Sequence, residues 1–386
     1  MKIVFFAHPL FLGSQSMPRF VNMLAEGMER RGHEVEVWSP EALFSNIPLK
    51  KLKKWFGYMD QYLVFPQSVK SKLRKKGNDV LYVVSDHALG PYVPLIAHLP
   101  HVIHCHDFLA QRSALGEIPE NVTSASGQKY QAYIRRGYSR GRNFISVSEK
   151  TRTDLAAFLP AKPERSEMVY NGLNPSFKPA PVAISRATLG SKLNMDLSQG
   201  YILHVGGNQW YKNREGIVGI YDKWREIYGI DLPLLLVGQP PSPGLLEKYE
   251  QSAWKKDIHF LSAIDDHLVT VAYSGATVFL FPSIAEGFGW PIAEAMASGT
   301  LVVTTNEAPM LEVAGDAAFL IDRRPLEDSL QDQWTDGAAG ILNKAITLNE
   351  TERAQAVQKG LINISRFKLE DALDSIERIY KQVLNN

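Results

Sequence analysis

Two glutamates eight positions apart flank a glycine-containing turn, and this segment carries the clearest chemistry of the 386-residue chain. Glu286 directly precedes the tripeptide Gly287-Phe288-Gly289, and Glu294 lies five residues beyond it. Glycine allows positive φ and close backbone approach, so this turn can present free N–H groups. Pro291 suits the first position of a helix, and Gly299 suits the residue just past its end. The segment therefore predicts an anion site at a helix N-terminus, most naturally for phosphate.

The two carboxylates are expected to contact opposite ends of a ligand whose phosphate lies between them. A carboxylate accepts hydrogen bonds from vicinal hydroxyls, as on a sugar or a ribose. A sugar, a diphosphate and a ribose in a row describe a sugar nucleotide. A dinucleotide fingerprint fits less well, because Ile292 occupies the place of the third glycine. The chain also lacks the Gly-x4-Gly-Lys-Ser/Thr pattern of P-loop NTPases.

Short apolar runs alternate with helical patterns along nearly the whole chain, which predicts parallel sheets covered by helices on both faces. The proline-containing segment 171–185 interrupts this alternation and is interpreted as an interdomain linker. Strands are predicted at 3–7, 34–38, 79–84, 101–104, 143–147, 168–170, 201–205, 232–237, 258–261, 278–281, 301–304 and 318–321. Helices are predicted, for example, at 17–31, 151–159, 213–228, 291–298 and 369–384.

The predicted architecture is α/β, with two doubly wound, Rossmann-like domains. An N-terminal acceptor-side domain is expected at 1–175, joined by the C-terminal helix 369–386, and a donor-binding domain at 186–368. Ligands of open parallel sheets bind beyond the carboxyl ends of the strands. We therefore expect the two sheets to face each other across a cleft walled by strand-to-helix loops.

Further motifs follow one another in order along the chain. They are His106-Asp107, Val147-Ser148-Glu149, the string Tyr-Asn-Gly-Leu-Asn at 170–174, and Gly206-Gly207 followed by Lys212-Asn213. The two glutamates resemble the Glu-x7-Glu signature of retaining glycosyltransferases. Together with these motifs, the chain resembles glycosyltransferase family 4, which has the GT-B fold.

The resemblance implies a role for each matching residue of the donor site. Glu294 would hold the ribose hydroxyls, and Glu286 would hold hydroxyls of the donor sugar. The backbone amides of 287–289 and the ammonium group of Lys212 would neutralise the diphosphate. The segment 261–264, which ends at Ile264, would pair its backbone with the nucleobase.

The resemblance also assigns residues of the first domain. His106 would lie beside the donor sugar at the reacting centre, where it and Glu286 are the catalytic candidates. Gly13 would lie on the donor-side turn of the first sheet, within the sequence Leu-Gly-Ser-Gln that replaces the usual Gly-Gly. Arg19 and Tyr130 fit acceptor contacts and purely structural roles equally well.

One departure from the family pattern affects the diphosphate site. Gly207 stands where family members commonly carry arginine, so one phosphate-binding cation is missing. Asn208, Lys212 and Arg214 are the candidates to replace it, and the sequence does not decide among them.

Composition excludes several functions and compartments. With 42 Lys and Arg against 41 Asp and Glu, the chain has no global basic field to hold nucleic acid. The single cysteine, Cys105, suits a reducing cytoplasm, and no stretch approaches the ~20 apolar residues that span a bilayer. No Asp-x-Asp pair is present to hold a divalent cation on a diphosphate, and strand alternation separates Cys105 from His104 and His106. We expect a cytoplasmic enzyme that needs no cofactor and no metal.

The segment 50–76 departs from this neutral balance, with nine Lys or Arg and one acid, Asp60. Trp55, Phe56, Tyr58 and Tyr62 are interleaved with the basic residues. Basic residues near an anionic membrane each contribute about 1 kcal/mol of attraction. The segment is consistent with a patch that binds the inner face of a membrane, and equally with a solvated loop and helix.

We expect a retaining transferase that moves a hexose from a nucleotide diphosphate sugar to an acceptor hydroxyl, in polysaccharide or lipid-linked glycan synthesis. Family frequency favours a UDP-hexose, with glucose first and GDP-mannose next. A glycogen- or sucrose-type synthase shares the same fold and glutamates. A non-catalytic sugar-nucleotide-binding protein and an epimerase are the alternatives from other classes.

Overall fold

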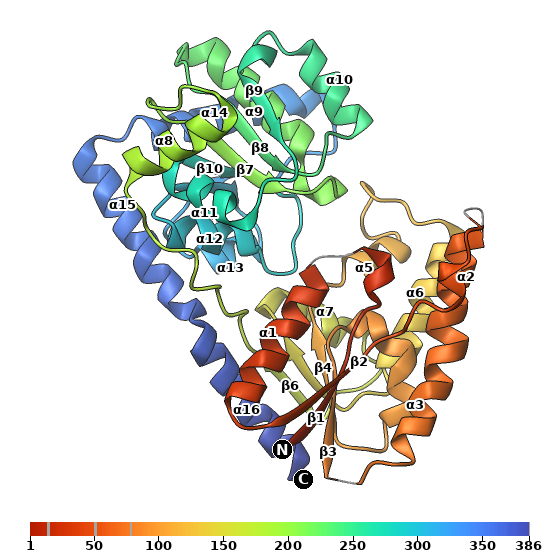
Figure 1. Cartoon of the computed structure of the whole chain (residues 1–386). Helices are drawn as coiled ribbons and strands as arrows, with labels where there is room; N and C mark the ends of the chain where they lie inside the picture. Colours follow the sequence, from red (N-terminus) through yellow and green to blue (C-terminus); the bar gives the residue numbers. More distant parts are fainter. Residues whose placement is uncertain (14–15, 50–51, 78, 386) are drawn as a thin grey trace. The chain divides into compact units, whose positions relative to one another are not determined.

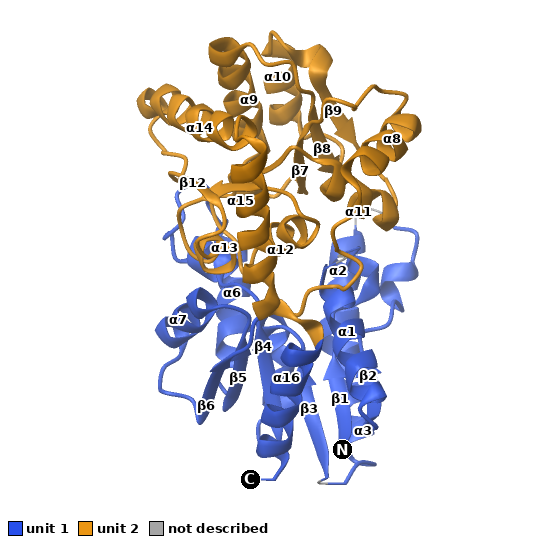
Figure 2. Ribbon diagram, turned by 90° about the vertical axis from the view of Figure 1, so that its left-hand side faces the viewer, with its two compact units in different colours: residues 1–171, 370–386 blue, residues 172–369 orange. Residues whose placement is uncertain are grey.

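The computed structural model describes residues 1–13, 16–49, 52–77 and 79–385. The chain divides into two compact units, which Figure 2 shows in different colours. Unit 1 comprises residues 1–171 and 370–386, and unit 2 comprises residues 172–369. Each unit is built on a parallel sheet against which helices pack, as the alternating pattern predicts (Figure 1).

The described strands of unit 1 form one sheet in the order β2-β1-β3-β4-β5-β6. The strands are β1 (Lys2–Phe6), β2 (Glu34–Trp38), β3 (Val80–Val84), β4 (His101–Cys105), β5 (Asn143–Ser146) and β6 (Arg165–Met168). The helices are α1 (Ser16–Arg30), α2 (Lys53–Met59), α3 (Phe65–Leu73), α4 (Val93–Ile96), α5 (Leu109–Ala114), α6 (Ala125–Tyr138), α7 (Glu149–Phe158) and α16 (Leu369–Leu384).

The apolar pattern explains how α1 covers this sheet. Phe20, Leu24 and Met28 repeat every fourth residue and are buried, because positions four apart lie on one helical face. The central strands β3 and β4 are buried along their whole length, which is typical of parallel strands covered on both sides.

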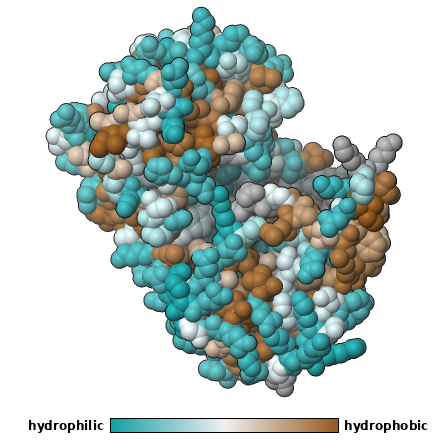
Figure 3. Space-filling view, viewed as in Figure 1, coloured by the Kyte–Doolittle hydropathy of each residue, from teal (hydrophilic) through white to brown (hydrophobic). Residues whose placement is uncertain are grey.

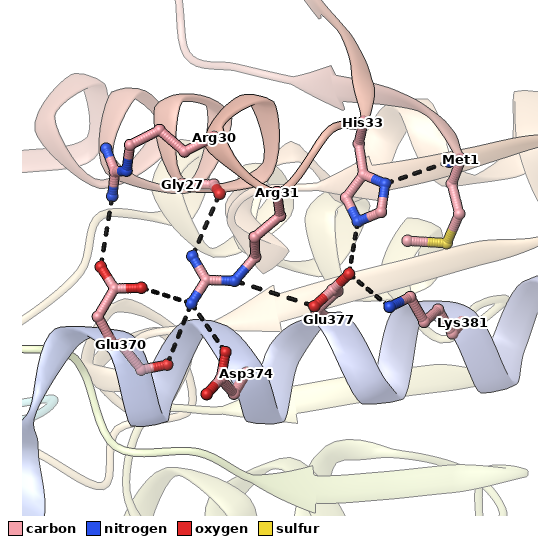
Figure 4. A network of polar contacts seen from close by, with 9 residues as sticks. All are labelled: Met1, Gly27, Arg30, Arg31, His33, Glu370, Asp374, Glu377 and Lys381. Carbon is pink, nitrogen blue, oxygen red and sulfur yellow. Dashed lines mark hydrogen bonds and ion pairs between the residues drawn. The ribbon is translucent and has the colours of Figure 1, made fainter.

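The C-terminal helix α16 completes unit 1 by packing against α1. Its Leu373 is fully buried beside Gly27 of α1, where even a methyl group would collide with the leucine. A row of ion pairs borders this contact (Figure 4). Arg31 contacts Glu370 at 2.5 Å and Asp374 at 2.8 Å, and His33 Nε2 lies 2.7 Å from Glu377 Oε1.

The described strands of unit 2 form a second parallel sheet in the order β12-β11-β10-β7-β8-β9. The strands are β7 (Ile202–Gly206), β8 (Leu234–Gly238), β9 (Ile258–Leu261), β10 (Val278–Phe281), β11 (Val302–Thr305) and β12 (Phe319–Ile321). The helices are α8 (Val182–Leu193), α9 (Arg214–Tyr228), α10 (Pro243–Gln251), α11 (Asp266–Gly275), α12 (Trp290–Ala297), α13 (Met310–Ala314), α14 (Gln331–Ile346) and α15 (Glu350–Asn363).

Two predicted elements differ from the structure by more than a residue or two at their ends. The strand predicted at 168–170 is instead β6 at Arg165–Met168, because this half-buried edge strand pairs in register with Asn143–Ser146 rather than following an apolar run. The predicted linker 171–185 is helical from Val182 onward. Its first part belongs to unit 2, since the backbone N–H of Leu173 donates to Phe367 O at 2.7 Å.

Across the described residues, none of the helices combines the length and the apolar character that crossing a bilayer requires.

Candidate functional site

The strand order of unit 2 reverses between β7 and β10. From β7 the chain adds β8 and β9 on one side of the sheet, and then β10, β11 and β12 on the other. Loops that follow the two strands at such a reversal diverge and leave room for a ligand at the carboxyl edge. The loop after β7 carries Lys212, and the loop after β10 carries Glu286.

Lys212 and Glu286 form an ion pair between these two loops. Lys212 Nζ lies 2.6 Å from Glu286 Oε1, and the two side chains are only 13% and 9% exposed. Two hydrogen bonds join the same loops. The Ile284 N–H donates to Tyr211 O at 2.7 Å, and the side-chain Nδ2 of Asn213 donates to Pro282 O at 3.0 Å. The structure thus brings together two of the residues that the sequence predicted at the donor site.

The loop after β10 leads directly into α12, as the glycine and proline pattern predicts. Gly289 caps the helix with φ +101°, and Gly299 follows its end with φ +80°. The sequence predicted Pro291 as the first residue of this helix. The helix instead begins at Trp290, so Pro291 is its second residue. Phe288 is buried against Phe367, with ring centroids 5.5 Å apart, so its side chain anchors the turn in unit 2.

Glu294 lies on α12 and is held by a buried tyrosine. Tyr273 donates its hydroxyl hydrogen to Glu294 Oε2 at 2.8 Å. Burial and the neighbouring Glu294 carboxylate raise the pKa of Tyr273 well above its usual value, so this tyrosine remains a hydrogen-bond donor. The sequence gives no local signal for this partnership, because 21 residues separate the two side chains.

Arg214 is buried behind the loop that contains Gly207. Its Nη1 donates to Asn208 Oδ1 at 2.5 Å and to Gln239 O at 2.9 Å, and burial lowers the pKa of Arg214 to about 10. The Asn208 backbone N–H in turn donates to the Gln239 side chain at 3.0 Å. Asn208 and Arg214 therefore join the loops after β7 and β8, whereas Lys212 is the candidate cation whose ammonium group meets Glu286.

Ile264 follows β9 at the same carboxyl edge. It comes directly after Ala263, which has the left-handed φ of +60° in a loop outside the named strands. No structural observation tests whether this segment pairs with a nucleobase, and that role stays a prediction.

In unit 1, His106 lies at the end of β4 and is fixed by the end of β3. Its Nε2 donates to Ser85 O at 2.9 Å, which leaves Nδ1 as the acceptor nitrogen of a neutral ring. Burial lowers the pKa of His106, and the ring of Phe20 packs edge-on at a centroid distance of 4.4 Å. His106 is therefore a neutral, rigidly held imidazole at the carboxyl edge of the first sheet.

His8 and Asp86 are candidate residues that the sequence reasoning missed. His8 follows β1 and Asp86 follows β3, and the strand order of unit 1 reverses between these two strands. His8 Nε2 lies 2.9 Å from Asp86 Oδ2. The signal available in the sequence is their position, because His8 directly follows the predicted strand 3–7 and Asp86 lies two residues after the predicted strand 79–84.

The remaining candidates of unit 1 lie in different settings. Gly13 has φ +72° and open space around its α-carbon, and Ser14 and Gln15 beside it lie outside the described residues. Arg19 is exposed on α1. The Tyr130 hydroxyl is occupied by the Tyr62 hydroxyl at 2.5 Å, so the structure gives Tyr130 a packing role in addition to any acceptor contact.

His104 and Cys105, the last two residues of β4, are buried in unit 1. His104 Nε2 lies 2.7 Å from the hydroxyl of Tyr380 on α16, and burial lowers the pKa of His104 to about 3. Cys105 is buried, and its pKa is raised by burial. In the described parts of the chain, no group of three or more His, Cys, Asp or Glu side chains is placed to hold a metal ion.

Family models match both units. A model described as "Glycosyltransferase Family 4" matches residues 17–177, and one described as "Glycosyl transferases group 1" matches residues 199–336. The chain belongs to the family 4 glycosyltransferases.

Curated relatives of this family 4 chain include mannosyltransferases. O-antigen chain mannosyltransferase B of Escherichia coli is 29% identical over 188 residues, which cover 47% of this chain and 46% of the relative. Phosphatidyl-myo-inositol mannosyltransferase of Mycobacterium leprae is 24% identical over 94% of this chain and 92% of its own length. The chain thus matches about half the length of the first relative and nearly all of the second.

Solved structures share the fold over the whole chain. Sucrose-phosphate synthase from Thermosynechococcus elongatus has a TM-score of 0.74 at 17% identity, covering 99% of this chain and 98% of that one. HepE from Anabaena, in complex with UDP and glucose, has a TM-score of 0.70 at 16% identity, covering 98% of both chains. The two parallel sheets of this family 4 chain are those of the GT-B fold, as predicted.

Proposed function

We propose that the chain transfers a hexose from a nucleotide diphosphate sugar to an acceptor hydroxyl in glycan synthesis, with retention of configuration. The observation that carries this proposal is the Lys212–Glu286 pair, which lies at the strand reversal of unit 2 beside the start of α12. A cation and a helix N-terminus suit a diphosphate, and a carboxylate suits sugar hydroxyls.

The proposed reaction is a front-face substitution. The acceptor oxygen bonds to the anomeric carbon while the bond from that carbon to the diphosphate oxygen breaks, and the leaving diphosphate takes the acceptor proton. Lys212 and the α12 N-terminus stabilise the negative charge that grows on the diphosphate. Glu286 and the neutral imidazole of His106 are the groups proposed to stabilise the oxocarbenium-like sugar, and Glu294 is proposed to hold the ribose.

For the donor, we propose GDP-mannose first and UDP-glucose second. This order reverses the expectation from family frequency, because the relatives from Escherichia coli and Mycobacterium leprae are named as mannosyltransferases, whereas the UDP-bound neighbour shares only 16% identity. The test is a thermal-shift and turnover screen of both donors and both free nucleotides. Release of GDP or UDP from a donor, even by slow hydrolysis, supports the enzyme, whereas binding without any release supports a non-catalytic binding protein.

We propose that the reaction needs no divalent cation. The chain has no Asp-x-Asp pair, and Lys212 and the α12 N-terminus supply positive charge at the proposed diphosphate site. Activity should survive EDTA. Loss of activity on chelation, restored by Mg²⁺ or Mn²⁺, would contradict this part of the proposal.

We also propose that unit 1 binds anionic membrane from the cytoplasmic side through α2 and the loop before it. Trp55 is 65% exposed, and Lys53 and Lys54 beside it are exposed, while Lys50 and Lys51 lie outside the described residues. Figure 3 shows apolar surface gathered over this part of unit 1. The exposed apolar side chains of the preceding loop are Leu43, Ile47, Leu49 and Leu52.

Contacts within the segment support a narrower choice of residues for the proposed surface. The single acid, Asp60, is buried and accepts the backbone N–H groups of Phe44 and Ser45, each at 2.9 Å. It therefore holds the apolar loop against the helix instead of offsetting the surface lysines. Tyr58 and Tyr62 pack against Tyr130, whereas Trp55, although its ring contacts Tyr58 edge-on, is 65% exposed and is the aromatic residue proposed to enter the interface.

A further inference from the structure

The two charges proposed to bind the donor neutralise one another in this structure. Lys212 Nζ and Glu286 Oε1 are 2.6 Å apart, and neither side chain makes a second ion pair among the described residues. The ammonium group also lies 5.0 Å from the ring centroid of Phe281 and 5.4 Å from that of Tyr211. Glu286 is therefore its anionic partner on a side otherwise lined by aromatic rings.

Hydrogen bonds between the two loops hold this pair in place. The Ile284 N–H donates to Tyr211 O, and the side-chain amide of Asn213 donates to Pro282 O, so the loop after β10 is joined to the residues on both sides of Lys212. Asn213 Oδ1 accepts a further hydrogen bond from Arg324 Nη1 at 2.9 Å. An anionic ligand of Lys212 therefore competes with the carboxylate, because the loops keep the two groups within reach of each other.

We propose that Glu286 makes the site discriminate between the sugar-bearing donor and the spent nucleoside diphosphate. The inference rests on the proposed function. A nucleotide sugar presents hydroxyls to Glu286 and a diphosphate to Lys212. Each of the two side chains therefore gains a group of the donor in place of the other side chain. A nucleoside diphosphate has no sugar to occupy Glu286. Its phosphates then compete with the carboxylate for Lys212 and are repelled by it, an effect that partial burial strengthens.

The consequence is selective weakening of the product complex. Release of the nucleoside diphosphate restores the Lys212–Glu286 pair, and this recovered attraction favours dissociation of the product. The donor does not lose the same binding free energy, because its sugar hydroxyls donate hydrogen bonds to the Glu286 carboxylate. Glu286 is in this view a specificity-determining residue in addition to its proposed contact with the sugar.

The test is calorimetric binding of UDP, GDP, UDP-glucose and GDP-mannose to the full chain and to Glu286→Gln. Removing the charge frees Lys212 and removes the repulsion, so we expect the matching nucleoside diphosphate to bind about tenfold more tightly, or about 1.4 kcal/mol. The matching nucleotide sugar should gain less or bind more weakly, because its hydroxyls lose an ionised acceptor. Glu286→Ala, which also frees the lysine, should change product affinity in the same direction and serves if the amide variant does not fold.

Two controls separate this effect from a general change in charge. Glu250→Gln removes one carboxylate from the exposed pair with Lys255, also in unit 2, and should leave both affinities unchanged. In a Lys212→Met background, the gain from Glu286→Gln should shrink markedly, because the lysine it frees is gone.

The outcomes distinguish failure of the proposed discrimination by Glu286 from failure of the proposed function. Product affinity that is unchanged or weaker in both Glu286 variants, while the unmodified chain binds nucleotides, would overturn the discrimination and leave the proposed function standing. Failure of the unmodified, folded chain to bind any of the four compounds would overturn the proposed function and the inference together.

Discussion

His8 Nε2 lies 2.9 Å from Asp86 Oδ2, and this pair spans the strand-order reversal of unit 1. Lys212 and Glu286 span the reversal of unit 2 in the same way. Burial by itself raises the pKa of Asp86, but the hydrogen bond from His8 and the close contact of His87, whose Nδ1 lies 3.0 Å from Asp86 Oδ1, outweigh it and hold that pKa well below its ordinary value. Ser85, the neighbour of Asp86, accepts the hydrogen bond of His106. The end of β3 therefore orients two imidazoles at one edge of the first sheet.

Replacing Lys212 should impair chemistry more than folding. Lys212→Met removes the cation that faces a diphosphate whose charge grows as the glycosidic bond breaks, so kcat should fall about 10²–10³-fold. Steady-state rates with the donor found in the screen provide the measurement. Lys255→Met removes an exposed lysine from the same unit and should retain full activity. An equal loss in both variants would refute the assignment.

Replacing Glu294 should act mainly on donor binding. Its carboxylate is proposed to bond the ribose in the ground state and in the transition state alike, so Glu294→Ala should raise KM about tenfold or more with kcat little changed. Tyr273→Phe removes the hydroxyl that positions this carboxylate at 2.8 Å and should raise KM less. A large fall in kcat at unchanged KM would place Glu294 at the reacting centre instead.

Replacing His106 should separate binding from turnover. His106→Ala should lower kcat while nucleotide affinity measured by calorimetry stays nearly unchanged, because His106 is proposed to serve the sugar and not the base. His98→Ala, at an exposed position of the same unit, is the matched control. Loss of nucleotide binding in His106→Ala, or turnover at the unmodified rate, would show that the proposed reacting centre is misplaced.

Membrane binding should depend on salt and on the α2 surface. Exposed charges are screened over about 8 Å at physiological ionic strength, so co-sedimentation with anionic liposomes should decrease as salt rises. Lys53→Glu combined with Lys54→Glu should reduce it strongly. The same double charge reversal at exposed Lys248 and Lys359 of unit 2 should have little effect. Equal binding to neutral liposomes would show that α2 is an ordinary solvated helix.

His204 should make the folded chain sensitive to mild acid. Burial lowers the pKa of His204 to about 3. Below the ordinary histidine pKa of about 6.5, the unfolded chain therefore binds a proton at His204 that the folded chain does not bind. The free energy of unfolding should therefore fall as the pH drops from about 6.5 toward about 3. His204→Phe keeps the aromatic stack with Phe279 and Phe281 but removes this titration.

Urea unfolding at about pH 7.5 and about pH 5 measures the difference. The loss of unfolding free energy between the two pH values should be about 2 kcal/mol smaller in His204→Phe than in the unmodified chain. The same loss in both proteins would show that His204 does not titrate as its burial implies.

The local sequence determined most of the secondary structure and the chemistry of the donor loop. Short segments of four or five residues, alternating in β2 and mainly apolar in β9 and β10, predicted these strands with their observed bounds. The glycines around 287–299 predicted the capped helix α12, because positive φ and helix ends are constraints within a few residues. β6 was displaced, since a half-buried edge strand lacks the continuous apolar run on which the prediction depended.

Only the tertiary structure decided which side chains meet. Lys212 and Glu286 are 74 residues apart, and His8 and Asp86 are 78 residues apart. Either pair forms because parallel strands bring their carboxyl ends to one edge, and the strand order that makes them neighbours is a property of the whole sheet. The contact of Arg214 with Gln239 O, 25 residues away, and the choice of α1 as the helix against which α16 packs were likewise decided by packing between distant segments. Residue types determine which chemical groups this chain carries, but long-range packing determines which partner each charged group contacts.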